Sequence, residues 1–215
     1  MPLSVYFYVP NLIGYARVAL AFVGYALAPT QPELTFGTYM LSQLLDAADG
    51  YAARALKQSS TFGAVLDMVT DRASTTCLCV VLANFYPQYT LAFTALVTLD
   101  MFSHWFHMYA SLLQGIGSHK EVTSPLLRFY YWKPVLFIVC SATETWYTSL
   151  YLLAHFEGPS LRSLVGLPMD VGLVRALFLF CTPLFAFKQV ANFVQMKGAC
   201  DALVEHDAKP GKKAK

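Results

Sequence analysis

The fold is decided by residues 46–71, which read DAADGYAARALKQSSTFGAVLDMVTD and place two aspartates on each side of a short polar break. Apolar runs continue from both ends of this stretch and predict two helices, over residues 35–56 and 63–85. The aspartates fall in pairs, two in each predicted helix. The carboxylates are therefore placed by the helical period and are not scattered along a loop.

The spacing within each pair sets the direction of the side chains. At about 100° per residue, Asp46 and Asp49 lie on one face of the first helix. Asp67 and Asp71 lie on one face of the second helix by the same geometry. The pattern predicts two neighbouring helices that each present two carboxylates to a common cavity.

Small residues accompany the carboxylates on both faces. Gly50 and Ala53 share the face of the first pair, and Gly63 and Ala64 open the second helix. Small side chains let helix backbones approach each other closely. This pattern supports a tight contact between the two helices.

The composition places the chain in a membrane. Of the 215 residues, 56% are hydrophobic and only 13% are charged, and the mean hydropathy is +0.47. A soluble domain carries about 25% charged residues, so this chain has too little polar surface to cover a soluble particle. The net charge of +2 gives no argument for a nucleic-acid partner. We expect an all-α, polytopic membrane protein in contact with the lipid bilayer.

Six segments are long and apolar enough for a bilayer core, which needs about 20 residues per helix. The predicted spans are residues 11–28, 35–56, 63–85, 90–113, 134–155 and 171–195. They form one predicted membrane domain over residues 1–200, followed by a basic tail over 201–215. Because Pro10-Asn11 interrupts the first apolar stretch and no basic segment precedes it, we expect the first span to be retained.

The basic residues predict the orientation. With six spans both termini lie on one side, and that side collects three basic groups. The groups are Arg54 and Lys57; Lys120, Arg128 and Lys133; and Lys197, Lys209, Lys212, Lys213 and Lys215. The opposite side has Arg162 and Arg175. An excess of Lys and Arg marks the cytosolic side, so both termini are expected in the cytosol.

The last residues suggest a compartment. Lys212 and Lys213 lie four and three places from the C-terminus and resemble a dilysine retrieval signal of the endoplasmic reticulum. We therefore expect the protein in the endoplasmic reticulum membrane. A basic tail that only contacts anionic lipid is the alternative.

Four carboxylates inside membrane helices require compensation. Each ionised Asp at a helix centre costs about 2.5–3.5 kcal/mol. Few basic residues can reach them: Arg54, Arg72 and, from the first span, Arg17. Two divalent ions would neutralise all four charges. Carboxylate oxygens suit Mg²⁺ or Mn²⁺, and a pair of such ions suits phosphoryl displacement.

The eight fixed positions of the opening stretch resemble the signature of the CDP-alcohol phosphotransferases. These positions are Asp46, Asp49, Gly50, Ala53, Arg54, Gly63, Asp67 and Asp71. The resemblance implies a six-helix core with the active site between helices 2 and 3, open to the cytosol. It also implies a homodimer.

The resemblance further implies a role for each residue. All four aspartates would hold the two metal ions, and Asp71 would also be the general base. Gly50 and Gly63 would contact CDP-diacylglycerol, whose phosphate Arg54 would bind as a second catalytic residue. An arginine suits a diphosphate because its guanidinium is forked.

Three further residues could bind the nucleotide substrate. Ser60 and Thr61 precede the second aspartate helix, where their hydroxyls could bind phosphate or only cap the helix. Both readings stay open. Asn11 opens the first span beside Pro10, as the family's helices do, and could reach the nucleotide from there.

Three stretches bear on which alcohol accepts the transferred group: Asn11–Arg17, Leu44–Arg72 and Ser103–Trp105. They resemble the eukaryotic family members that transfer a phosphatidyl group to myo-inositol, with phosphatidylinositol and CMP as products. Asp100, His104 and His107 share one face of the fourth span and are candidate inositol contacts. Hydrogen bonding between helices is the alternative for this face.

Two other functions are compatible with buried carboxylates. The same family with glycerol 3-phosphate or serine as acceptor would use the same signature. A phosphorylated acceptor would need an additional cationic cluster, and the basic residues here lie mostly at the membrane surface. A transporter or proton relay also places Asp inside membranes, but it does not require this Asp/Gly/Arg spacing.

Overall fold

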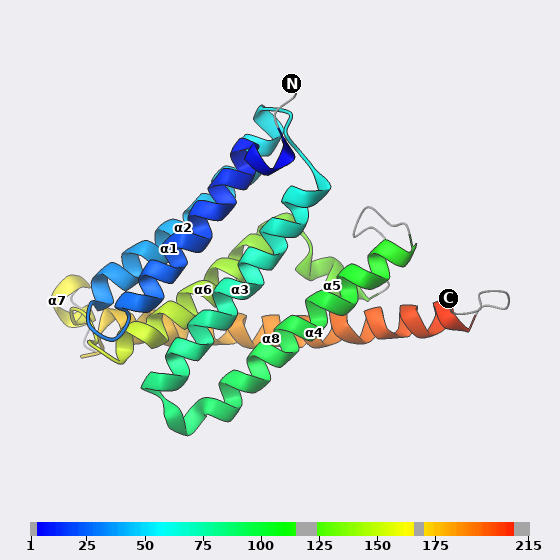
Figure 1. Ribbon diagram of the computed structural model, residues 1–215. Coiled ribbons are helices and arrows are strands. Elements are labelled where there is room, and N and C mark those ends of the chain that lie inside the picture. The colour runs from blue at the N-terminus through cyan, green and yellow to red at the C-terminus, as the bar shows by residue number, and fades with distance from the viewer. Residues whose placement is uncertain (1–3, 115–123, 166–169, 209–215) are drawn as a thin grey trace. The chain divides into compact units, whose positions relative to one another are not determined.

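The computed structural model describes residues 4–114, 124–165 and 170–208, and within them every named element is helical (Figure 1). One isolated bridge joins Ser160 and Gly172. In chain order the elements are η1 (Val5–Phe7), α1 (Val9–Leu27), α2 (Pro32–Ala55), α3 (Thr61–Phe85), η2 (Pro87–Tyr89), α4 (Thr90–Gln114), α5 (Pro125–Tyr130), α6 (Lys133–Leu153), α7 (Leu161–Val165) and α8 (Leu173–Asp207). The expected all-α fold class is confirmed for these residues.

Each of the six predicted spans overlaps one long helix, namely α1, α2, α3, α4, α6 and α8. The largest difference is at α8, which continues to Asp207 although the predicted span ends at residue 195. Polar residues lower the hydropathy after that point, but they do not interrupt a helix. The predicted boundary between residues 200 and 201 falls inside α8, and that division stays a prediction. Lys120 and the end of the tail, 209–215, lie outside the described residues.

Two of the described helices, α1 and α8, are long and apolar enough by composition to cross a membrane. The aspartates lower the hydropathy of α2 and α3. In α4, polar residues interrupt the apolar sequence, and two of them, Asp100 and Ser103, are buried. Helix length and composition therefore support a membrane protein without fixing the number of spans.

The chain forms two compact units. The first contains residues 1–90 and 151–156, with α1 packed mainly along α2 and also against α3. Gly24 permits close packing of α1 on α2, because a Cβ atom there would lie 2.8 Å from Oγ1 of Thr38. Thr35 donates a hydrogen bond to the Gly24 carbonyl at 3.0 Å. These contacts fix how α1 lies along α2, which matters for the site.

The second unit contains residues 91–150 and 157–215. Its core joins Leu127 and Tyr130 of α5 to Val139 of α6 and Ala191 of α8. Between α6 and α8, the ring of Trp146 stacks on Phe185 with centroids 3.8 Å apart. The second unit is thus held together by aromatic and aliphatic packing along α8.

Candidate functional site

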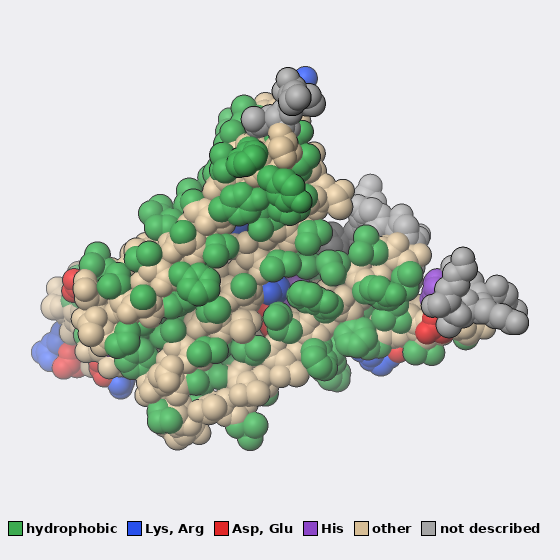
Figure 2. Space-filling model, in the orientation of Figure 1, with side chains coloured by type: hydrophobic (Ala, Val, Ile, Leu, Met, Phe, Trp, Pro, Cys, Tyr) green, Lys and Arg blue, Asp and Glu red, His purple; other side chains and the backbone are tan. Residues whose placement is uncertain are grey.

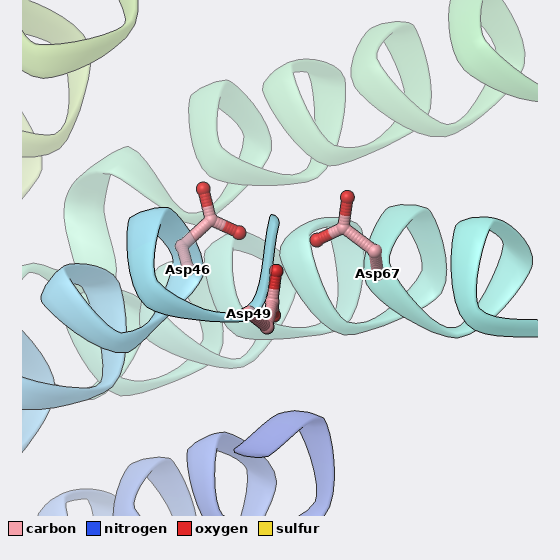
Figure 3. A group of neighbouring side chains, drawn as sticks. All are labelled: Asp46, Asp49 and Asp67. Carbon is pink, nitrogen blue, oxygen red and sulfur yellow. The ribbon is translucent and has the colours of Figure 1, made fainter. Parts of the chain in front are cut away.

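Three carboxylates from two helices converge in the first unit. Asp46 and Asp49 project from α2 and Asp67 projects from α3, toward the space between the helices (Figure 3). One ligand oxygen from each lies within 4.8 Å of the others. A set of carboxylate oxygens at this spacing fits a hard divalent cation such as Mg²⁺ or Mn²⁺. The predicted meeting of the two aspartate helices is therefore present.

The guanidinium of a buried arginine lies among these carboxylates. Nη1 of Arg17, from α1, is 2.6 Å from Oδ1 of Asp46. The same nitrogen is 3.0 Å from Oδ2 of Asp49 and 3.0 Å from Oδ1 of Asp67. The Arg17 side chain is 0% exposed. Charge-assisted hydrogen bonds of this kind are among the stronger contacts in proteins, so Arg17 ties α1 to the two aspartate helices.

The fourth aspartate joins the group through the same guanidinium. Nη2 of Arg17 lies 2.5 Å from Oδ1 of Asp71, one helical turn after Asp67. Nη2 of Arg72 approaches Oδ2 of Asp71 at 3.7 Å. When all groups are ionised, four carboxylates and Arg17 carry a formal charge of −3. The cluster is therefore suited to further cations.

A cavity of about 190 Å³ adjoins the carboxylates in the first unit. Its lining includes seven of the predicted site residues: Asn11, Asp49, Gly50, Arg54, Ser60, Gly63 and Asp67. Gly50 has no side chain where the guanidinium of Arg54 passes, since a Cβ atom would lie 3.4 Å from Nη1. An arginine, the N-termini of α1 and α3 and backbone exposed at glycine make this cavity suitable for an anionic ligand.

The start of α3 is built around Gly63. The hydroxyl of Ser60 accepts a hydrogen bond from the Gly63 amide at 3.0 Å, so Ser60 caps the helix. The side chain of Asn11 is buried, and its Nδ2 donates to the carbonyl of Val5 at 2.6 Å. A Cβ atom at Gly63 would lie 2.9 Å from Oδ1 of Asn11. Gly63 therefore lets α1 and α3 approach beside the cavity.

Among the described residues, no hydrogen bond supports the predicted role of Thr61. Thr61 is the first residue of α3 and is exposed, and its side chain does not cap the helix. The capping contact comes from Ser60 alone. Whether either hydroxyl also meets a phosphate stays a prediction.

The predicted acceptor residues lie in the second unit, on α4. His104 places Nδ1 2.8 Å from the carbonyl oxygen of Asp100, while His107 stacks on Tyr131 with ring centroids 6.3 Å apart. Oδ1 of Asp100 accepts a hydrogen bond from Nδ2 of Asn192 at 3.3 Å. His104 and Asp100 thus form polar contacts within this unit, to which α8 contributes, and His107 contacts an aromatic ring.

Sequence reasoning missed the partners that α8 supplies. Lys188, Asn192 and Gln195 are buried, although each has a polar side chain. Nε2 of Gln195 donates to the carbonyl of Ser103 at 3.1 Å. The three residues recur at intervals of four and three, which places them on one helical face. That period in an otherwise apolar segment is the signal that could have identified them.

The fold and the site together define the class: a helical protein with a carboxylate cluster, suited to divalent cations, beside a cavity suited to an anion. A family model described as CDP-alcohol phosphatidyltransferase matches residues 7–155. The chain belongs to this family, as its opening signature predicts.

Curated relatives match over nearly the whole chain. The CDP-diacylglycerol--inositol 3-phosphatidyltransferase of Schizosaccharomyces pombe is 42% identical over 227 residues, covering 99% of this chain and 95% of that protein. The Homo sapiens protein of the same name is 42% identical over 209 residues, covering 95% of each chain. An Arabidopsis thaliana protein, CDP-diacylglycerol--inositol 3-phosphatidyltransferase 1, is 42% identical over 211 residues, with 95% and 92% covered. No solved structure matches the chain.

Proposed function

We propose that this protein transfers the phosphatidyl group of CDP-diacylglycerol to myo-inositol, giving phosphatidylinositol and CMP. The observation that carries the proposal is the 42% identity to inositol 3-phosphatidyltransferases, which extends over nearly the full length of both chains. The carboxylate cluster beside an anion-binding cavity is the site such a reaction needs.

The residues of the first unit have different roles in binding the nucleotide. The guanidinium of Arg54, which lines the cavity, binds the diphosphate of CDP-diacylglycerol. Asn11, Ser60 and the two glycines, Gly50 and Gly63, shape the cavity and offer polar groups to the nucleotide. These contacts hold the phosphorus of the phosphatidyl group in place for attack, which is the larger part of catalysis in phosphoryl transfer.

Asp71 takes the proton of the attacking hydroxyl. The inositol oxygen forms a bond to the phosphorus that carries diacylglycerol, the bond from that phosphorus to the CMP oxygen breaks, and CMP leaves. The carboxylate of Asp71 suits this role because it belongs to the cluster but lies outside the group of three oxygens that converge most closely. A positioned general base contributes about 10²–10⁴-fold to a rate.

The donor set fits two divalent ions, Mg²⁺ or Mn²⁺, held by Asp46, Asp49, Asp67 and Asp71. When bound, such ions supply positive charge that offsets the charge of the diphosphate and of the departing CMP. Two ions would change the formal charge of the cluster, with Arg17 included, from −3 to +1. That value favours an anionic substrate.

Inositol is proposed to meet α4 of the second unit. Asp100, His104 and His107 offer donors and acceptors on one helix face, as a polyol requires. Asn192 strengthens this proposal, since its Oδ1 is buried and has no hydrogen-bond partner among the described residues. A hydroxyl donor of the substrate or a water molecule would satisfy that oxygen.

We further propose that α1, α2, α3, α4, α6 and α8 all span the membrane of the endoplasmic reticulum. Hydrophobic side chains cover much of the face shown in Figure 2. Large ones are highly exposed on helices of both units, for example Leu44, Leu91 and Phe180. Apolar side chains exposed in this number suit lipid contact. The distribution of basic residues supports the proposal that both termini and the carboxylate site face the cytosol, and a homodimer is the proposed assembly.

The experiment is CMP release from the purified full chain in detergent or lipid nanodiscs. CDP-diacylglycerol and Mn²⁺ or Mg²⁺ are supplied with inositol, glycerol 3-phosphate or serine in separate reactions. We expect release with inositol, and a loss of at least about 100-fold in Asp71→Asn. Asp201→Asn is the matched control, because Asp201 pairs with Lys197 on the exposed surface of α8 and its loss should leave the rate unchanged.

The outcomes separate the parts of the proposal. Release with glycerol 3-phosphate or serine instead of inositol would keep the family and contradict the acceptor. An Asp71→Asn protein that retains full activity would contradict the assigned base. Absence of release with every acceptor, in protein that binds Mn²⁺ and is folded, would contradict the enzymatic function.

A further inference from the structure

Arg17 lies where a metal ion would compete with it. Its Nη1 atom is 2.6–3.0 Å from one oxygen of each carboxylate in the triad Asp46, Asp49 and Asp67. A Mg²⁺ ion held by the same oxygens would lie about 2.0–2.1 Å from each. Two cations cannot occupy one space among three oxygens. Metal binding at this triad therefore requires the guanidinium to move.

We propose that Arg17 is the built-in counter-cation of the carboxylate cluster and that the first divalent ion displaces its guanidinium from the triad. This inference rests on the proposed metal-dependent function. Arg17 then acts as a positioning residue, because it holds the four carboxylates together and sets how tightly metal binds.

The geometry of the fork supports this role. Nη1 serves the triad while Nη2 binds Asp71 at 2.5 Å, so one planar group fixes the distance between Asp71 and the other three carboxylates. A guanidinium suits this task because its donors are held in a rigid plane. Lysine offers a single ammonium nitrogen and cannot bridge two positions in the same way.

The contacts of α1 show which part of Arg17 can stay in place while a metal ion displaces its guanidinium. Oγ of Ser42 donates to the carbonyl oxygen of Arg17 at 3.0 Å, which fixes the backbone against α2. Nε of Arg17 is buried and has no hydrogen-bond partner among the described residues. The side chain is thus held at its end, by Nη1 and Nη2, and those contacts are the ones that a metal ion would replace.

The charge balance gives the direction of the effect. Arg17 lowers the negative charge that attracts a metal ion, and its displacement costs free energy that the ion must supply. Removing the guanidinium should therefore strengthen metal binding and destabilise the protein when no metal is added. A residue with only a packing role would not change the metal affinity in this direction.

The test measures the affinity of the purified full chain for Mn²⁺ without substrate. Free Mn²⁺ is quantified by electron paramagnetic resonance during the titration. We expect Arg17→Gln to bind Mn²⁺ about tenfold more tightly than the unmodified protein, within the usual range of coupling between two ligands. Its melting temperature in EDTA should fall, and added Mn²⁺ should raise it more than in the unmodified protein. Arg17→Lys keeps the charge and should give an intermediate affinity.

Arg72→Gln is the matched control. Nη2 of Arg72 approaches Oδ2 of Asp71 at 3.7 Å, farther than Arg17 lies from any of the four carboxylates, so its replacement should change the Mn²⁺ affinity by less than about twofold. An Arg17→Gln affinity that is unchanged or weaker than that of the unmodified protein would overturn the inference. If the unmodified protein binds no Mn²⁺, the metal-dependent function itself fails, which is a distinct result.

A second measurement needs no folded Arg17→Gln protein. In the unmodified chain labelled with ¹⁵N-arginine, the side-chain resonance of Arg17 is assigned by its absence in Arg17→Lys. Added Mg²⁺ should move this resonance and leave that of Arg128, on α5 of the second unit, in place. A resonance of Arg17 that does not respond to saturating Mg²⁺ would also overturn the inference.

Discussion

Gly63 provides a direct test of how the nucleotide cavity is built. A Cβ atom at this position would lie 2.9 Å from Oδ1 of Asn11 and 3.1 Å from Oγ of Ser60. Contacts this short force the neighbours to shift. We predict that Gly63→Ala raises the KM for CDP-diacylglycerol and leaves the KM for inositol near its original value.

The magnitude follows from the bonds that would be disturbed. Oγ of Ser60 caps α3, and loss of a cap costs about 1 kcal/mol. The buried side chain of Asn11 donates to the carbonyl of Val5 at 2.6 Å, and such a bond contributes about 1 kcal/mol net. Alanine returns up to about 1 kcal/mol through its better helix propensity. The free energy of unfolding should therefore fall by about 1 kcal/mol.

Gly37 is the matched control, because it lies within α2 and a Cβ atom there meets nothing within 4 Å. Gly37→Ala should raise the melting temperature of the purified protein and leave both KM values unchanged. The assay is CMP release at varied CDP-diacylglycerol and at varied inositol, with thermal unfolding measured in the same detergent. If Gly63→Ala is stabilised like Gly37→Ala and keeps its KM for CDP-diacylglycerol, the packing around Asn11 and Ser60 does not shape the cavity.

Four other changes test separate parts of the molecule. Chelation with EDTA should abolish CMP release, and added Mg²⁺ or Mn²⁺ should restore it; activity that persists in EDTA would contradict a metal-dependent reaction. Asp49→Asn removes one carboxylate of the triad and should weaken Mn²⁺ binding at least about tenfold, or 1.4 kcal/mol, measured by titration calorimetry. His104→Ala should raise the KM for inositol at least about threefold, since one lost hydrogen bond is worth about 1 kcal/mol; an unchanged value removes His104 from the acceptor pocket. Tyr151→Phe removes the bond from the hydroxyl to the Ala28 carbonyl, 2.8 Å long, and should lower the free energy of unfolding by about 1 kcal/mol without altering either KM.

The aspartate helices could be predicted because two independent constraints agree. A helical period fixes which side chains share a face, and the cost of burying a charge requires that these faces meet cations. Both constraints act within a stretch of 26 residues, so no long-range information is needed. The structure brings Asp46, Asp49 and Asp67 together, as that argument requires.

Arg17 could not be chosen from composition alone, because Arg54 and Arg72 lie nearer to the aspartates in sequence. The signal was present in the pattern of α1. Its buried face carries Asn11, Gly14 and Arg17 at three-residue intervals, and small and polar residues on one face indicate a helix contact. What the sequence lacked was the way α1 lies along α2, which depends on contacts between segments such as that of Thr35 with the Gly24 carbonyl.

The end of α8 could not be predicted from hydropathy, for a different reason. Hydropathy detects where a segment stops being apolar, but a helix ends only when its backbone loses hydrogen bonds or meets a breaker. Residues 196–207 include the pair Lys197 and Asp201, one turn apart, with Nζ and Oδ2 separated by 2.6 Å. Such a pair supports a solvent-exposed helix. The predicted span of 171–195 therefore describes the apolar part of α8 and not its full length.

On the proposed assignment of the inositol contacts to α4, the division into two units explains why the signature does not identify the acceptor. All eight signature positions lie in the first unit, with Arg17 and the cavity. The polar groups of α4 and α8 lie in the second unit, where the hydroxyl of Tyr131 donates to Oε1 of Gln195 at 2.5 Å. Burial raises the pKa of Tyr131 to about 12, so this hydroxyl remains a donor at neutral pH. If the proposed inositol contacts are correct, a change of acceptor would need changes in the second unit and none in the carboxylate cluster, which is consistent with one signature serving family members with different alcohols.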